Sequence, residues 1–116
     1  MHELSVTEDI LRICLAAAEE NGLGRIMKIH LEIGVLNDLK QEWIQRYFDR
    51  LSRGTIAENA EVSVVTRPVL LFCKNCRKEY AIEIQKVSRL ECPDCHGTDC
   101  RVEGGSGYII KDIEGV

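Results

Sequence analysis

The sequence is poor in long apolar runs, basic charge and aromatic side chains, and each shortage excludes a class of protein. No apolar run approaches the ~20 residues that a membrane-spanning helix needs. The first residues also lack the basic start and the apolar run of a secretory signal. We therefore expect a cytoplasmic protein without membrane contact, in a compartment where structural disulfides are rare.

The shortage of basic and aromatic residues also argues against nucleic acid as a partner. The formal net charge is −4, and aromatic residues make up 5% of the chain. Nucleic-acid binding usually needs a basic face, together with exposed aromatic side chains where single strands are bound. The cysteine-rich segment 69–103 carries as many acidic as basic side chains, and its aromatic residues are Phe72 and Tyr80.

What the chain does have is cysteine in a regular pattern. Cys73 and Cys76 form one Cys-x-x-Cys hook, and Cys92 and Cys95 form a second hook after fifteen intervening residues. This spacing is typical of a zinc ribbon, in which four thiolates surround zinc at about 2.3 Å. Iron remains an alternative metal, because a tetrahedron of sulfurs suits both. A thiol-exchange centre is disfavoured, since its hook normally opens a helix. Four protein ligands leave no open position for catalysis, so we expect a structural site.

The remaining cysteines and two of the histidines receive simpler interpretations. Cys14 falls on the apolar side of a predicted helix, where cysteine behaves as a small hydrophobic residue. His30 falls on the polar side of a predicted strand and is expected to face solvent. His96 and Cys100 follow the second hook and are expected not to bind metal. Either could still replace one of the four cysteines, because imidazole and thiolate both bind zinc.

The first half of the chain predicts helix, strand and helix in turn. Ser5 and Glu8 have the spacing of a capping box, and helical periodicity then continues to a stop at Asn21-Gly22. The apolar face of this helix is predicted to hold Ile10, Ile13, Cys14, Ala17 and Ala18. Residues 26–34 alternate like a half-buried strand, whose inner face is predicted to hold Met27, Ile29, Leu31 and Ile33.

A second helix is predicted from its cap and its apolar stripe. Asp38 and Gln41 have the spacing of an N-cap signature, and the helix is expected to end near residue 52. The stripe includes Trp43, the only tryptophan, so we expect this helix to anchor the core. A strand follows at 61–67, where Pro68 ends its hydrogen-bond ladder.

Two further strands are predicted, at 80–84 and 108–113, with a turn at 85–89, an exit from the second hook at 100–103 and a flexible return at 104–107. The last strand is expected to rejoin the first sheet, because a two-stranded sheet is only marginally stable. The predicted fold class is α+β: two helices packed on a three-stranded sheet, with an inserted four-cysteine zinc-ribbon domain. The predicted boundaries are 1–68 and 105–116 for the α+β domain and 69–104 for the ribbon domain.

The N-terminal residues have a chemistry that the fold does not need. We expect Met1 to keep its free amine, because initiator methionine is normally removed only ahead of small residues and His2 is bulky. The amine has a pKa of about 8 and the imidazole a pKa of about 6.5, so both nitrogens are available to a metal near neutral pH. With ionised backbone amides they could form a planar nitrogen site, which favours Ni(II) or Cu(II) over zinc.

The chain resembles the HypA/HybF family of nickel metallochaperones along its whole length. The resemblance is carried by segments in a fixed order and spacing: Met1-His2-Glu3-Leu4-Ser5, Leu31-Glu32-Ile33-Gly34, Arg53-Gly54-Thr55-Ile56-Ala57-Glu58 with Ala60-Glu61, the hooks with Cys92-Pro93-Asp94-Cys95-His96-Gly97, and Ile110-Lys111-Asp112-Ile113-Glu114. The family matures [NiFe]-hydrogenase, and some relatives also serve urease.

The resemblance implies two metals with different roles. His2 would be the essential nickel ligand, supported by Met1 and Glu3. Where some relatives carry an acidic residue near the second helix, this chain has Lys40, which leaves Asp38 as the candidate carboxylate. The four cysteines of the hooks would hold structural Zn(II), with Ni(II) as transient cargo.

The implied partners are the GTPase HypB and the [NiFe]-hydrogenase large-subunit precursor, with the chain acting as a monomer or weak homodimer. No enzymatic turnover is expected. A zinc-ribbon interaction adaptor without a nickel role is the alternative function. A zinc hydrolase is excluded, because the cysteines close the zinc site and the three histidines are scattered.

Overall fold

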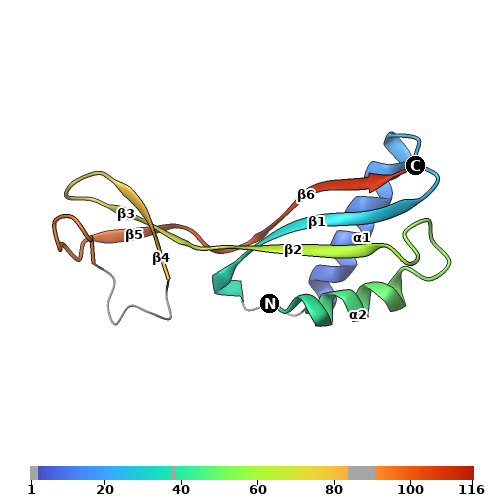
Figure 1. Ribbon diagram of the computed structural model, residues 1–116, viewed down its shortest axis with the longest axis horizontal. Helices are drawn as coiled ribbons and strands as arrows, with labels where there is room; N and C mark the ends of the chain where they lie inside the picture. The colour runs from blue at the N-terminus through green and yellow to red at the C-terminus, as the bar shows by residue number, and fades with distance from the viewer. Residues whose placement is uncertain (1–2, 38, 84–90) are drawn as a thin grey trace.

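The computed structural model describes residues 3–37, 39–83 and 91–116. The molecule is elongated, with extents of 54 × 26 × 17 Å, and its two three-stranded sheets follow one another along the long axis (Figure 1). The chain passes from the first sheet to the second between β2 (Glu61–Arg67) and β3 (Val69–Cys73), and it returns between β5 (Cys100–Gly104) and β6 (Tyr108–Gly115).

The first sheet has the strand order β2-β1-β6, with β1 (Ile26–Gly34) in the centre. β2 pairs with β1 in parallel, and β6 pairs with β1 antiparallel. The final strand therefore rejoins the first sheet, as predicted. The four cysteines of the hooks lie between β2 and β6 in the sequence, although both strands belong to the same sheet. The cysteine segment is therefore an insertion between two strands of one sheet.

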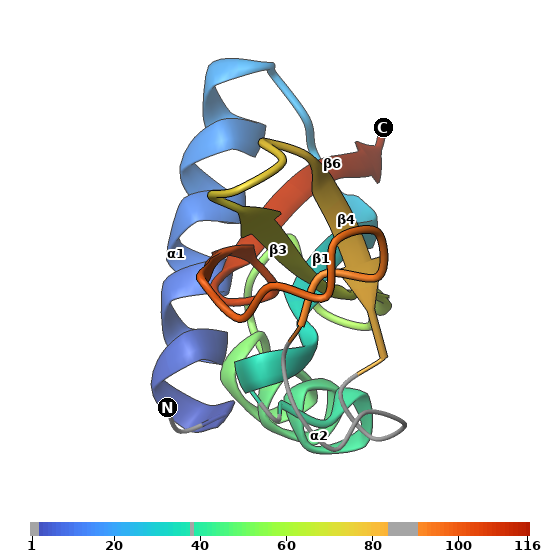
Figure 2. The same ribbon diagram turned by 90° about the vertical axis from the view of Figure 1, so that its left-hand side faces the viewer.

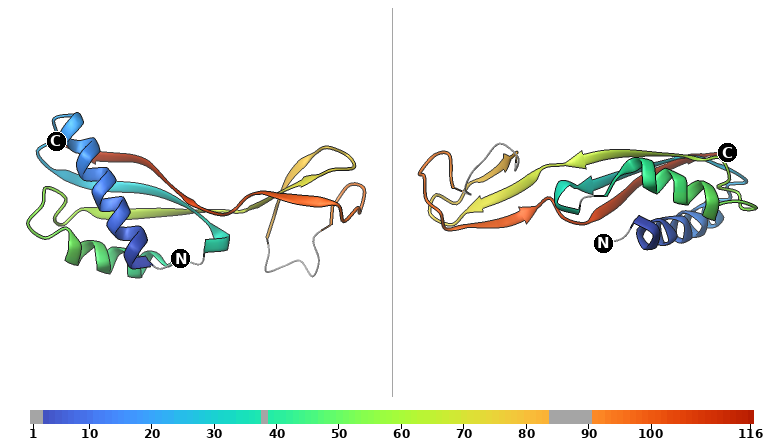
Figure 3. Two further views of the ribbon diagram at one scale, coloured as in Figure 1. Left: turned by 180° about the vertical axis from the view of Figure 1, so that it is seen from behind. Right: turned by 90° about the horizontal axis from the view of Figure 1, so that it is seen from below.

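Two helices in the described residues, α1 (Glu3–Glu20) and α2 (Gln41–Leu51), cover one face of the first sheet (Figure 3). The buried core lies between this sheet face and the helices and consists of Val6, Ile10, Cys14, Ala18, Ile26, Ile29, Leu31, Ile33, Ile44, Phe48, Ala57, Ala60 and Val62. Phe48 is its largest fully buried side chain, and burial of a side chain of this kind contributes about 1.5–3 kcal/mol. The predicted α+β class, with helices on a three-stranded sheet, is confirmed.

Both helices begin elsewhere than the capping patterns predicted. α1 already includes Glu3, so Ser5 lies inside the helix instead of capping it. α2 begins at Gln41 and has Lys40 at its N-cap, because the Lys40 carbonyl accepts the first helical hydrogen bond from the Ile44 amide (3.1 Å). Gln41 does not close a capping box; its side-chain amide donates to the Val62 carbonyl of β2 (3.1 Å).

Three apolar residues assigned to the core are exposed: Ile13 (42%), Met27 (53%) and Trp43 (41%). In α2 the inward line is formed by Ile44 and Phe48, which are four residues apart, and Trp43 lies beside that line with Arg46 stacked on its ring. In β1 a bulge between residues 26 and 28 shifts the alternation, so Ile26 takes the inward position.

The second sheet has the order β4-β3-β5, with both neighbours antiparallel to β3. β4 is Glu79–Ile82. Figure 2 views the molecule from this end, where the loops that carry the cysteine hooks lie in front of the strands. The predicted turn at 85–89 lies outside the described residues.

The two sheets meet at a tightly packed glycine crossing. The Gly34 amide at the end of β1 donates to the Gly107 carbonyl (2.9 Å). The Leu36 amide of the 3₁₀ turn Val35–Asn37 donates to the Gly105 carbonyl (2.8 Å). Gly105 is buried with a φ of 106°, a conformation that requires glycine. The return predicted to be flexible is therefore hydrogen-bonded and packed.

Candidate metal centre

The two cysteine hooks have the same backbone structure. The backbone of the first cysteine in each hook donates one hydrogen bond and accepts another. In the first hook, Cys73 N–H donates to Lys78 O (2.9 Å) and Arg77 N–H donates to Cys73 O (2.8 Å). In the second hook, Cys92 N–H donates to Gly97 O (2.9 Å) and His96 N–H donates to Cys92 O (2.8 Å). The residue that follows each hook, Arg77 or His96, has a left-handed φ of 59°. This repeated turn points both sulfurs of a hook toward one place.

The four sulfurs converge as a tetrahedral metal site requires. The Sγ atoms of Cys73, Cys76, Cys92 and Cys95 all lie within 4.8 Å of one another. Two distances that join different hooks are 3.6 Å (Cys73 to Cys95) and 3.5 Å (Cys76 to Cys92). A tetrahedron of sulfurs each about 2.3 Å from zinc has edges of about 3.8 Å. The donor set therefore fits a zinc ion, and it equally fits iron.

Without a cation, these sulfurs cannot all be thiolates. Backbone N–H donation, first from Cys76, lowers the pKa of the Cys73 thiol to about 6. The hydrogen bond to the Cys92 sulfur raises the pKa of Cys76 to about 12. One sulfur is thus predisposed to ionise while its neighbour is held protonated. A divalent cation would remove this conflict, because it stabilises all four as thiolates.

Ion pairs reinforce the approach of the hooks. Lys78 after the first hook lies 3.2 Å from Asp94 inside the second, and this carboxylate raises the pKa of the lysine. Lys74 inside the first hook lies 3.6 Å from Asp99 beyond the second. All four side chains are mostly exposed, so solvent screens each pair and its contribution to stability is small. The two ion pairs therefore orient the hooks toward each other and add little to the stability of the fold.

The spare histidine and cysteine beside the second hook lie outside this four-sulfur cluster. His96 Nδ1 is 3.7 Å from a Glu91 carboxylate oxygen. Cys100 Sγ is 3.2 Å from the Tyr80 hydroxyl and 3.7 Å from the Gly97 carbonyl. Cys14, by contrast, is fully buried on the inner side of α1, and burial raises its pKa to about 11. It is the inert core residue that the sequence predicted.

The predicted nickel ligands are only partly within the described residues. Met1, His2 and Asp38 lie outside them. Glu3 is the first residue of α1, and it lines an open hollow of about 450 Å³ together with Leu4, Ser5, Glu8 and Tyr47. Tyr47 of α2 thus reaches the start of α1, a contact that no local sequence pattern indicated. This hollow brings the carboxylates of Glu3 and Glu8 together at the start of α1.

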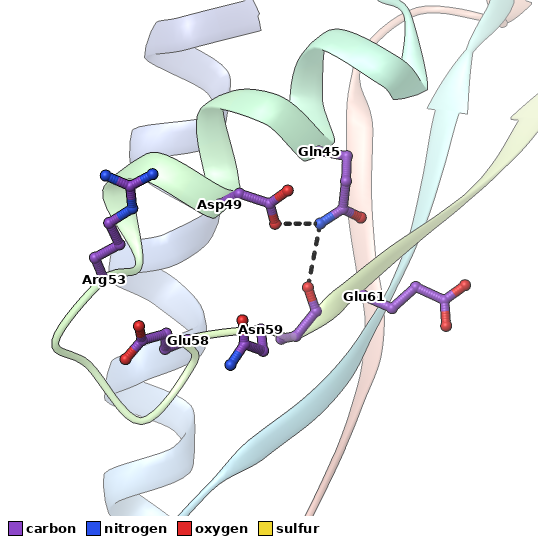
Figure 4. A pocket seen from close by; sticks show the side chains of 7 residues that line it. Gln45, Asp49, Arg53, Glu58, Asn59 and Glu61 are labelled. Carbon is purple, nitrogen blue, oxygen red and sulfur yellow. Dashed lines mark hydrogen bonds between the residues drawn. The ribbon is translucent and has the colours of Figure 1, made fainter.

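A second hollow, of about 440 Å³, lies between the end of α2 and the loop before β2 (Figure 4). Gln45 forms one wall, where its side-chain amide donates to Asp49 (2.8 Å) and to the Ala60 carbonyl (3.2 Å). The side-chain oxygen of Gln45 accepts a hydrogen bond from the Val62 amide (2.8 Å). Gln45 therefore joins α2 to β2 at the wall of this hollow.

The fold and the sulfur cluster define an α+β protein with a four-cysteine metal site inserted into a helix-covered sheet. Residues 1–115 match the family model described as hydrogenase/urease nickel incorporation, metallochaperone, HypA, and the chain belongs to this family. It is 37% identical over 115 residues to hydrogenase maturation factor HypA of Rhodobacter capsulatus, with 98% of each chain covered. It is 33% identical over 114 residues to hydrogenase maturation factor HybF of Salmonella typhimurium, again with 98% of each covered.

Solved structures show the same fold. The solution structure of the Ni metallochaperone HypA from Helicobacter pylori aligns with a TM-score of 0.72 at 20% identity, over 100% of this chain and 98% of that one. A second solution structure, of a HypA protein, gives a TM-score of 0.77 at 20% identity, over 100% and 97%. Among the described residues, no helix is long and apolar enough to span a membrane.

Proposed function

We propose that this protein binds Ni(II) at its N-terminus and delivers it for insertion into [NiFe]-hydrogenase. His2 would supply the essential imidazole and amide nitrogens, Met1 its amine, and Glu3 or Asp38 a carboxylate. The partners would be the GTPase HypB and the hydrogenase large-subunit precursor. The observation that carries this proposal is the family match, which begins at residue 1 and so includes the predicted nickel ligands.

The residues at the start of α1 support a site that binds a cation reversibly. Glu3 and Glu8 bring negative charge to an open hollow at the start of α1. An open site with few ligands suits transfer to a partner, whereas four thiolates hold a metal firmly. We assign Zn(II) to Cys73, Cys76, Cys92 and Cys95 and Ni(II) to the N-terminus. The protein then works without catalysis, in the cytoplasm, as a monomer or weak homodimer.

The test is a Ni(II) titration, followed by calorimetry, of three zinc-loaded proteins. These are the unmodified chain, His2→Ala, and a chain with residues added before Met1. We expect tight binding of one Ni(II) by the unmodified chain and strongly weakened binding by the other two, because each change removes nitrogen ligands. Binding should also weaken as the pH falls and the nitrogens take up protons.

His96→Ala is the matched control, because it removes a histidine without touching the N-terminus. Its nickel affinity should equal that of the unmodified chain. Equal binding by all of these proteins would contradict the proposal and would favour the zinc-ribbon adaptor. A proposed delivery step additionally requires that a partner protein accelerate nickel dissociation, and no acceleration would contradict that step alone.

A further inference from the structure

Cys100 lies directly opposite a cysteine of the metal cluster. In the antiparallel pairing of β3 with β5, its Cα partner is Cys73. Residues directly opposite one another have side chains on the same face of the sheet. A fifth thiol therefore stands beside the four-sulfur site without being part of it.

The type of pairing brings these two cysteines within disulfide range. The next pair along is joined by a hydrogen bond from the Lys74 amide to the Asp99 carbonyl (3.0 Å). Hydrogen-bonded and non-hydrogen-bonded pairs alternate in an antiparallel ladder, so 73/100 is a non-hydrogen-bonded pair, with Cα atoms about 4.5 Å apart. The Cys73 amide indeed points the other way, to the Lys78 carbonyl (2.9 Å). A disulfide accepts Cα separations of about 4.4–6.8 Å, so this pair can close with little backbone movement.

The two sulfurs differ in their present partners. Cys73 Sγ is directed into the cluster, 3.6 Å from Cys95 Sγ. Cys100 Sγ is half-buried between the Tyr80 hydroxyl and the Gly97 carbonyl. When the four clustered sulfurs hold a metal, Cys100 is the uncoordinated thiol of this sheet. It is the sulfur that an oxidant can modify first while the metal is still bound.

We propose that Cys100 is an oxidation site which, after reaction with a peroxide, forms a disulfide with Cys73 and opens the four-cysteine metal site. Hydrogen peroxide oxidises the Cys100 thiol to a sulfenic acid, and one water leaves. The Cys73 thiolate then attacks the sulfenic sulfur: the S–S bond forms, the S–O bond breaks, and hydroxide leaves. Two electrons pass from the two sulfurs to one peroxide. Three thiolates remain for the metal, and a thiol reductant restores the fourth.

The test follows zinc release with a chromogenic chelator after hydrogen peroxide is added to the zinc-loaded full chain. Zinc content is measured before the oxidant, so a failure of the metal assignment is recognised separately and does not depend on the nickel proposal. We expect Cys100→Ser to retain zinc and to release it several-fold more slowly than the unmodified protein. Cys14→Ala, which removes a buried thiol of α1 in the other domain, should release zinc at the unmodified rate.

Peptide mapping identifies the bond. Cleavage with trypsin and with a protease that cuts before aspartate places Cys73, Cys76, Cys92, Cys95 and Cys100 on separate peptides, because Lys74, Arg77, Asp94 and Asp99 lie between them. The first disulfide to appear should join Cys73 to Cys100. A first disulfide within or between the hooks, or equal release rates for Cys100→Ser and the unmodified protein, would overturn the proposal. If the serine variant does not retain zinc, Cys100→Ala supplies the same comparison.

Discussion

At the scale of single residues, His30 shows how one side chain depends on a partner far away in the sequence. It lies on the polar face of β1, 33% exposed. Its Nε2 is 2.6 Å from a Glu114 oxygen and 3.6 Å from an Asp112 oxygen, both on β6. The outward orientation follows from the alternation of the strand. The two acidic partners follow only from the antiparallel pairing, which the sequence of β1 does not contain.

We predict that His30→Gln raises the pKa of Glu114 toward its ordinary value. The hydrogen bond from His30 is the main reason why this pKa is lowered. Because the folded-state pKa is below the unfolded value, the interaction stabilises the protein above the ordinary pKa and is lost as the pH falls through the folded-state pKa. Carboxyl titration by NMR measures the shift. His96→Gln should leave the pKa of Glu114 unchanged. An unchanged pKa of Glu114 in the His30→Gln variant would contradict the prediction.

The residues that the sequence predicted best are those whose chemistry is local. Two Cys-x-x-Cys hooks predict a cluster of four sulfurs because each hook needs only one tight turn. The exposure of Trp43 was not predictable in the same way, since it depends on which side of α2 meets the sheet. Likewise, the contact between Cys100 and Tyr80 depends on the registers of β4 and β5 against β3, which no local pattern specifies.

At the scale of elements, the strands were predictable wherever the alternation was uninterrupted. Ile29, Leu31 and Ile33 are buried as predicted, and Met27 is not, because it is the extra residue of the bulge between Ile26 and Lys28 in the pairing with β6. The rejoining of β6 was also predictable, because a sheet of two strands would be only marginally stable. The close crossing of Gly34 and Gly105 was not, because it brings together residues from opposite sides of the insertion.

We predict that Gly34→Ala destabilises the protein by about 2 kcal/mol or more. A Cβ on Gly34 would overlap the Gly105 carbonyl and lie 2.6 Å from the Ser106 amide nitrogen. These are backbone atoms fixed by the hydrogen bonds of the crossing, so they cannot move aside as the end of a side chain can. The free energy of unfolding from urea denaturation measures the effect.

Gly24→Ala is the matched control for this glycine. Its Cβ would meet only the Val116 carbonyl oxygen, at 3.8 Å, which is ordinary van der Waals contact. We expect its free energy of unfolding to stay near that of the unmodified protein. Equal stability of the two variants would show that the crossing can widen and would contradict the close packing described above.

At the scale of the whole molecule, the two sheets are stabilised in different ways. The first sheet has a core formed with two helices. The second sheet has no covering helix among the described residues, and its fully buried side chains in β3 are Val69, Leu71 and Cys73. So small an apolar contribution leaves little to offset the conformational entropy of folding. We therefore propose that 69–104 forms a metal-dependent domain and that 1–68 with 105–116 forms a metal-independent one.

Removing the metal tests this division. Binding of structural zinc contributes about 10–16 kcal/mol in comparable small units, so its loss should unfold the second sheet. After treatment with a strong chelator and a reductant, we expect amide hydrogen exchange to become fast throughout β3, β4 and β5. The amides of α1, α2 and β1 should stay protected, because their core contains none of the four clustered cysteines. Adding zinc back should restore protection. Loss of protection in both sheets together would mean that the crossing couples them into one cooperative unit, and the proposed domain boundaries would then be wrong.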